Sequence, residues 1–249
     1  DTARANVLSA TLLDYARDIH ARIGAWIPPE GVDVHQIAGW GAETFSGIQF
    51  YEEPRIVGLV GSKVPRYRPV FVEDGDGVVP SSSALFMRET DGASRYWIDL
   101  RQAKRSHADL LEIEDVREFI AGVLTDSADS LPPLLSTSKP GPSTPVRKIL
   151  FFLHSPLTLG IRDETGAYTG MNEDGSVTQE ILDIEYGQLG DVKYLIAPAG
   201  RDYTVVMHGL ADGVFSLDIL ERVRNNISTT TTIANVPSTA QTVATLAVP

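Results

Sequence analysis

A stretch rich in proline and serine, residues 127–146, divides this chain into two parts whose sequence patterns differ. Large apolar side chains are sparse in it, so the stretch is typical of a linker rather than of a hydrophobic core. We therefore expect a first domain over residues 1–126 and a second domain over residues 147–249. The prolines that interrupt the stretch are Pro132, Pro133, Pro140, Pro142 and Pro145.

The first part alternates between helix-like and strand-like patterns. Residues 5–26 carry apolar side chains at spacings of three and four, which predicts one helix ended by the prolines that follow. Strand-like segments lie at residues 31–38, 48–60 and 96–100, and a second helix pattern begins after His107. Strands that alternate with helices predict an α/β fold for this domain.

In the second part the apolar pattern changes to a period of two. Short strand-like segments are separated by turns such as Asp174-Gly175 and Asp212-Gly213. Several short strands without a long helix predict an all-β sandwich. The segments are residues 149–153, 157–161, 194–196, 203–207 and 214–219.

Composition excludes several classes of function for the 249 residues. The chain has 21 Lys and Arg against 33 Asp and Glu, a net charge of −12, which disfavours nucleic-acid binding because phosphate groups are repelled. It has no cysteine, so disulfides and thiolate metal sites are excluded, a composition that suits export. No apolar run reaches the about 18 residues that a membrane span requires. We expect neither a cofactor nor a bound metal.

The most informative short motif is the turn that carries Asp76. An apolar run at residues 69–72 reads as a buried strand and breaks into Gly75-Asp76-Gly77. Two flanking glycines allow a tight turn that presents the carboxylate at a strand end, where α/β folds place their sites. The alternative is an aspartate that only closes an Asx-type turn. Asp74 is a second candidate acid.

His107 precedes the second helix pattern and is the candidate general base. A histidine at this position can also be a helix-capping or a surface residue. Taken together, an acid after one strand and a histidine at a later helix start suit the second and third members of a Ser–Asp–His hydrolase site.

The first member of such a site, the nucleophilic serine, is not evident. The Gly-x-Ser-x-Gly motif that exposes a catalytic serine does not occur, and Ser46 and Ser62 stand in the wrong context. The chain opens at Asp1 and enters a helix pattern at once, which suggests that residues precede it. We therefore expect an upstream segment or a second chain to supply the serine.

Other groups of polar residues give weaker signals. Asp163-Glu164 and residues 172–175 hold oxygen ligands for Ca²⁺, but the spacing of a calcium loop fails, which favours solvated turns. His154 and His208 lie in strand patterns and are expected to be structural.

Three short motifs follow one another in the first domain. A Gly-x-Gly-x-x-Thr stretch lies in residues 37–44, a Gly-Asp-Gly-x-Val-Pro turn in residues 75–84, and a histidine before the last helix in residues 106–111. With these motifs in this order, residues 5–124 resemble the lecithin–cholesterol acyltransferase-like lipases of the α/β-hydrolase superfamily. The resemblance implies the C-terminal half of an α/β-hydrolase sheet, with Asp76 as the triad acid and His107 as the base. In that family the serine and the oxyanion-hole donors belong to the N-terminal half of the fold.

The resemblance implies a secreted or cell-surface serine hydrolase, a lipase, esterase or acyltransferase, acting on an ester or lipid substrate. Residues 147–227 resemble, more loosely, the β-sandwich modules appended to bacterial exported proteins. A second hypothesis is a non-catalytic binding or surface protein built on a degenerate hydrolase scaffold. Contact between Asp76 and His107 beside an open groove would favour the enzyme.

Overall fold

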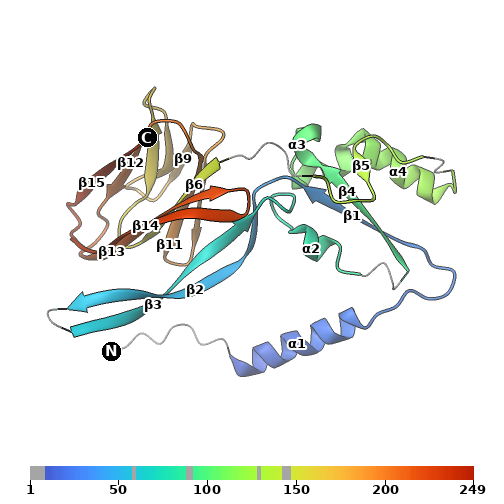
Figure 1. Cartoon of the computed structure of the whole chain (residues 1–249), viewed down its shortest axis with the longest axis horizontal. Helices are drawn as coiled ribbons and strands as arrows, with labels where there is room; N and C mark the ends of the chain where they lie inside the picture. The colour runs from blue at the N-terminus through green and yellow to red at the C-terminus, as the bar shows by residue number, and fades with distance from the viewer. Residues whose placement is uncertain (1–8, 58–59, 88–91, 128–129, 142–146) are drawn as a thin grey trace. The chain divides into compact units, whose positions relative to one another are not determined.

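The computed structural model describes residues 9–57, 60–87, 92–127, 130–141 and 147–249 (Figure 1). The chain forms two compact units. The first contains the residues up to Gly47 together with Val70–Gly141, and the second contains Ile48–Pro69 together with the residues from Pro142 onward.

The chain is mostly β, with 49% of residues in strands and 18% in helices, so the prediction of an α/β fold with an α/β-hydrolase half-sheet is wrong. Several antiparallel sheets take the place of a parallel sheet with alternating helices. The misleading signals were local ones. The strand patterns at residues 48–60 belong, in their described part, to a long hairpin instead of a central sheet, and the helices at Ser81–Ala84 and Leu100–Ala103 have only four residues each.

The first unit is built around a small three-stranded sheet with the order β1-β4-β5. Strands β1 and β4 pair in parallel, from Val34↔Ala93 to Trp40↔Asp99, so both end at the same edge of the sheet. The elements of this unit are α1 (Ala10–Gly24), β1 (Val34–Trp40), α2 (Ser81–Ala84), β4 (Ala93–Asp99), α3 (Leu100–Ala103), the 3₁₀ helix η2 (His107–Glu112), α4 (Glu114–Leu124) and β5 (Leu135–Ser136).

The core of the first unit joins strand β4 to helix α4. Ile98 of β4 is fully buried and packs with Val116 and Phe119 of α4. Leu135, in the stretch expected to be a linker, is also part of this cluster, and β5 pairs antiparallel with β4. Part of the stretch expected to be a linker therefore contributes to the core of the first unit, where Leu135 is buried and Leu131 and Leu134 are partly buried.

The second unit contains two five-stranded antiparallel sheets, with the orders β10-β11-β6-β13-β14 and β15-β12-β7-β8-β9. A cluster of buried side chains that includes Phe151, Leu153, Leu195 and Leu217 forms its core, which is consistent with the expected sandwich. Its strands are β6 (Arg147–His154), β7 (Gly160–Asp163), β8 (Tyr168–Met171), β9 (Val177–Gln179), β10 (Glu185–Leu189), β11 (Val192–Pro198), β12 (Tyr203–His208), β13 (Gly213–Val223), β14 (Asn226–Ser238) and β15 (Val243–Val248).

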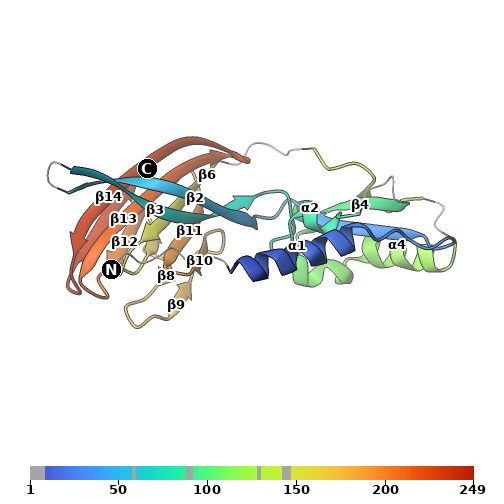
Figure 2. The same cartoon turned by 90° about the horizontal axis from the view of Figure 1, so that it is seen from below.

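Strands β2 (Thr44–Val57) and β3 (Val60–Val72) pair into a two-stranded hairpin (Figure 2), and the division between the two units falls within its sequence. Its residues 48–69 belong to the second unit, although the sequence placed them in the first domain. Buried polar contacts explain the difference: the Tyr51 hydroxyl donates to Asp218 at 2.5 Å and the Ser216 hydroxyl donates to Glu53 at 2.6 Å.

In the part of the chain that the structure describes, no helix is both long and apolar enough to cross a membrane.

Candidate functional site

Asp76 and His107 meet at the sheet edge where β1 and β4 end. Nδ1 of His107 lies 2.7 Å from Oδ2 of Asp76. The Asp76 side chain is 5% exposed and the His107 side chain is 43% exposed. The sequence placed Asp76 after a strand and His107 at a helix start, and the structure brings these two candidates into hydrogen-bond contact. Whether they are catalytic remains a prediction.

The turn around Asp76 uses the other oxygen of the carboxylate. Oδ1 accepts hydrogen bonds from the backbone N–H of Val78 at 2.9 Å and of Val79 at 2.7 Å. This is the Asx-type turn considered from the sequence. It does not exclude the other interpretation, since one carboxylate oxygen holds the turn while the second one holds the histidine.

Gly39 and Gly77 allow this close approach. A Cβ atom on Gly39, in β1, would lie 2.6 Å from Cβ of Asp76, so only glycine lets the turn pack against the strand. Gly77 has φ +97°, a conformation in which other residues are strained. The backbone of the turn is tied to the end of β1 by the Ala42 N–H, which donates to the Gly75 carbonyl at 3.0 Å.

His107 is the first residue of η2, and Ser106 is the residue that caps the start of this helix. The carboxylate of Asp109 accepts hydrogen bonds from the Ser106 hydroxyl at 2.8 Å and from its backbone N–H at 3.2 Å. These hydrogen bonds from Ser106 lower the pKa of Asp109. The helix start is therefore capped by its neighbours, and the imidazole of His107 is left to face Asp76.

The second ring nitrogen of His107 is open. Among the described residues, no group forms a hydrogen bond with Nε2. If Nδ1 carries the proton and donates it to Asp76, Nε2 is an acceptor with a free lone pair on a partly exposed ring. This is the arrangement that a general base needs before a hydroxyl group approaches it.

The other predicted candidates are engaged elsewhere. Asp74 pairs with Lys139 at 2.5 Å, so it is not the partner of His107. The Ser46 hydroxyl donates to the Val70 carbonyl at 3.1 Å. The side chain of Ser62 lies outside the described residues. Neither candidate serine is thus placed by the structure against His107.

Two residues near the site were missed by the sequence analysis. Thr44 forms hydrogen bonds with Ala42, in the loop after β1, and with Gly77, in the Asp76 turn, and Arg101 stacks on the ring of Trp40 at 4.0 Å from its centroid. Arg101 also pairs with Asp99 at 3.2 Å. The Gly-x-Gly-x-x-Thr pattern contained Thr44 without giving it a role, and no motif pointed to Arg101.

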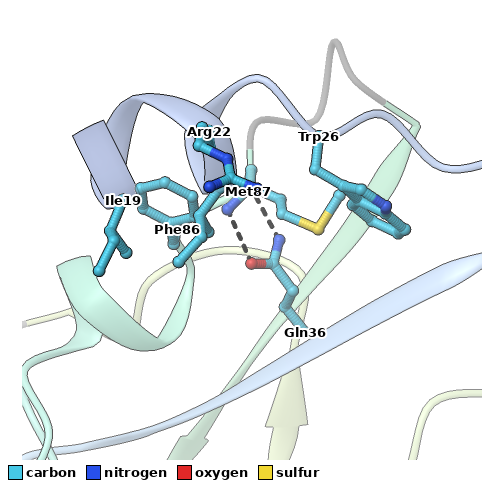
Figure 3. Close-up of a pocket in the computed structure, with 7 residues that line it drawn as sticks. Ile19, Arg22, Trp26, Gln36, Phe86 and Met87 are labelled. Carbon is cyan, nitrogen blue, oxygen red and sulfur yellow. Dashed lines mark hydrogen bonds between the residues drawn. The ribbon is translucent and has the colours of Figure 1, made fainter.

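An open groove of about 670 Å³ lies in the first unit, beside helix α1 (Figure 3). Gln36 closes its floor by exchanging two hydrogen bonds of 2.9 Å with the backbone of Met87. Trp26 and Phe86 are half exposed in its walls. Neither Asp76 nor His107 lines this groove, whose residues are Ile19, Arg22, Ile23, Trp26, Gln36, Phe86 and Met87.

The acidic turns considered as calcium loops use their carboxylates internally. Oδ1 of Asp163 accepts from the N–H and the hydroxyl of Thr165, and Oδ1 of Asp174 accepts from the same two groups of Ser176. Across the described ranges, no cluster of three or more histidine or carboxylate side chains could hold a metal ion. His154 and His208 lie in β6 and β12.

Comparisons with known proteins add little. No protein-family model matches the chain, and no curated protein matches it. Among solved structures, a DUF4425 family protein from Bacteroides ovatus is similar at 12% identity with a TM-score of 0.24. The match covers 43% of this chain and 95% of that protein. A likeness at this TM-score carries no argument about fold or function, and the resemblance to acyltransferase-like lipases stays a prediction.

Proposed function

We propose that Asp76 and His107 are the acid and the general base of a Ser–His–Asp triad that cleaves carboxylic esters, by hydrolysis or by acyl transfer. A single observation carries this proposal: a buried carboxylate lies 2.7 Å from Nδ1 of a histidine whose Nε2 is open to a partner. The serine would come from an upstream segment or from a second chain.

In the proposed mechanism His107 transfers protons in both halves of the reaction. As the serine oxygen attacks the ester carbonyl, Nε2 of His107 takes its proton, and the Asp76 carboxylate stabilises the imidazolium that forms. The imidazolium then returns this proton to the leaving alkoxide, which departs as an alcohol and leaves an acyl-serine. Water or an acceptor alcohol, deprotonated by His107, attacks the acyl group and regenerates the serine.

Burial of Asp76 favours this role. A carboxylate that is 5% exposed is shielded from water, so its attraction to a nearby imidazolium is stronger than it would be at a solvated surface. The two backbone donors on Oδ1 fix the plane of the carboxylate, and this leaves Oδ2 directed at Nδ1. Only His107 needs to exchange protons with its surroundings, and it is the exposed member of the pair.

The resemblance to acyltransferase-like lipases supports the proposal through its motifs alone. The Gly-Asp-Gly-x-Val-Pro turn and the histidine before a helix are the parts of that pattern present here. The corrected fold gives no additional support.

Labelling with a fluorophosphonate tests the proposal, because this reagent forms an adduct with a serine that a neighbouring base activates. The full-length protein, purified from its native source together with any chain that remains bound to it, would be labelled and mapped by mass spectrometry. We expect one serine adduct, and we expect His107→Ala to slow its formation at least about a hundredfold.

His208→Ala is the matched control. His208 is also partly exposed and lies 3.0 Å from a carboxylate, that of Glu173, but it belongs to the second unit. This variant should label at the wild-type rate. No serine adduct in the full-length protein, or an adduct rate that does not depend on His107, would refute the proposed function.

A further inference from the structure

Thr44 connects the two segments that meet behind Asp76. It opens strand β2 and is fully buried. Its hydroxyl donates to the Ala42 carbonyl at 3.0 Å, at the end of the loop that follows β1, and accepts from the Gly77 N–H at 2.9 Å. One side chain therefore links the loop after β1 to the turn that carries the carboxylate.

Thr44 also packs closely against Gly75, the residue that precedes Asp76. A Cβ atom on Gly75 would lie 2.4 Å from Oγ1 of Thr44 and 2.8 Å from its Cγ2, so the threonine side chain fills the space next to this glycine. Asp76 is thus held from both sides. Gly75 packs against Thr44, and Gly77 is hydrogen-bonded to it.

We propose that Thr44 is a positioning residue that sets the hydrogen bond between Asp76 and His107; the inference rests on the proposed function of that pair. Thr44 forms no hydrogen bond with His107 and has no part in the proton transfers. It acts by fixing the Gly75–Gly77 turn, so that the Asp76 carboxylate keeps both its backbone donors and its contact with Nδ1 of His107. A small rotation of the turn would separate the two groups.

Two substitutions separate the hydroxyl from the volume of the side chain. Thr44→Val keeps the branched shape but removes the acceptor for Gly77, and Thr44→Ser keeps the hydroxyl but removes a methyl group. In the full-length enzyme we expect Thr44→Val to lower kcat about tenfold with little change in KM, the size expected for the loss of one hydrogen bond. Thr44→Ser should recover most of that loss.

The second measurement does not depend on turnover. In the same full-length protein, with histidine labelled by ¹⁵N, a proton held between Nδ1 of His107 and Asp76 gives a low-field NMR resonance. We expect this resonance to weaken or disappear in Thr44→Val and to persist in Thr44→Ser. If Thr44→Val does not fold, Thr44→Ala is tested in the same way.

Thr169→Val is the matched control. Thr169 is fully buried in the second unit, where its hydroxyl accepts from the Ile181 N–H at 3.0 Å. Its loss should destabilise the protein and leave the His107 resonance unchanged. A folded Thr44→Val variant with a wild-type resonance and a wild-type kcat would overturn the inference. If no variant, including the wild type, turns over an ester, the proposed function fails while the resonance still tests the role of Thr44.

Discussion

The two units of this protein each contain a histidine close to a buried aspartate, and the two arrangements differ in what surrounds them. In the first unit His107 contacts Asp76 directly through Nδ1, and its side chain is 43% exposed. In the second unit Nε2 of His154 lies 3.9 Å from Oδ2 of Asp218, and both side chains are 3% exposed.

In the second-unit pair, Nε2 of His154 and both carboxylate oxygens of Asp218 have neighbouring partners. The Tyr51 hydroxyl lies between the two residues, 3.0 Å from His154 and 2.5 Å from Asp218. The Thr232 hydroxyl donates to the other oxygen of Asp218 at 2.7 Å, and Arg68 is 3.6 Å away. Burial lowers the pKa of His154, although the Asp218 carboxylate acts in the opposite direction.

The comparison shows that an acid next to a histidine is not by itself a catalytic arrangement. A general base needs one nitrogen that a partner orients and a second nitrogen that a substrate or nucleophile can reach. His107 has both within the described structure, whereas His154 is enclosed. We interpret the first pair as functional and the second as the attachment of the β2–β3 hairpin to the sandwich. The experiments below would strengthen or remove this distinction.

The largest expected effect is on ester turnover by the full-length protein. His107→Ala should lower kcat at least about a thousandfold, because it removes the general base that takes the proton from the serine in the proposed mechanism. His154→Ala should leave the rate of the folded protein unchanged. Turnover of a chromogenic ester measures both variants, and similar losses in the two would erase the distinction.

Asp76→Asn should lower turnover by a smaller amount, about a hundredfold, because the amide cannot stabilise the imidazolium. The remaining oxygen of the asparagine can still accept from Val78 and Val79, so the turn should stay folded. Circular dichroism would verify the fold, and steady-state kinetics would measure the loss. Asp74→Asn is the control, and an equal loss there would favour the rival acid.

Tyr51→Phe should lower the free energy of unfolding by about 2 kcal/mol, because it leaves the buried Asp218 and His154 without their shared hydroxyl. Denaturant unfolding measures this effect. Tyr67→Phe is a matched control on the same hairpin, since the Tyr67 hydroxyl also donates to a carboxylate, Asp191, at an exposed position. Its effect should stay below about 1 kcal/mol. Equal effects would mean that burial of the Tyr51 network adds nothing.

The smallest expected effect is on the pH dependence of the protein's stability. Because the pKa of His154 is lowered in the folded protein, the unfolded chain takes up a proton first as the pH falls below about 6.5, so stability decreases there. Burial, with the hydrogen bond to Asp218, raises the pKa of Tyr51. The unfolded chain therefore loses this proton first above about pH 10, and stability decreases again.

His154→Gln should flatten the acid side of this profile and Tyr51→Phe should reduce the alkaline side, as followed by thermal unfolding across pH. The same stability profile is measured for His107→Gln, which removes the histidine of the other pair. An unchanged acid side in His154→Gln would mean that another group controls the loss of stability at low pH.

Local signals in the sequence singled out Asp76 and His107, which the structure brings into contact and whose catalytic role stays a prediction. A Gly-Asp-Gly turn after an apolar run, and a histidine at a helix start, are features of a few neighbouring residues. The helix spacing in residues 5–26 likewise corresponds to α1, and the period of two corresponds to the strands of the second unit. These features depend on chain geometry over a few residues only.

The remaining features depend on partners far away in the sequence. Tyr51 and Asp218 are 167 residues apart, so no pattern around residue 51 shows that the hairpin belongs with the second unit. Leu135 looked like part of a linker because its burial depends on β4 and α4. The role of Thr44 was invisible for the same reason, since Gly75 and Gly77 lie about thirty residues further along the chain.

The β2–β3 hairpin also limits which fragments of this chain would keep their native contacts. The chain passes between its two units three times, after Gly47, after Pro69 and after Gly141. A cut at the last point alone would give a C-terminal fragment that keeps Asp218 and Ser216 but lacks Tyr51 and Glu53, so both residues would lose hydrogen-bond partners that the hairpin provides. Genetic exchange of the sandwich as a simple C-terminal cassette is therefore disfavoured, and the two halves are expected to be inherited together.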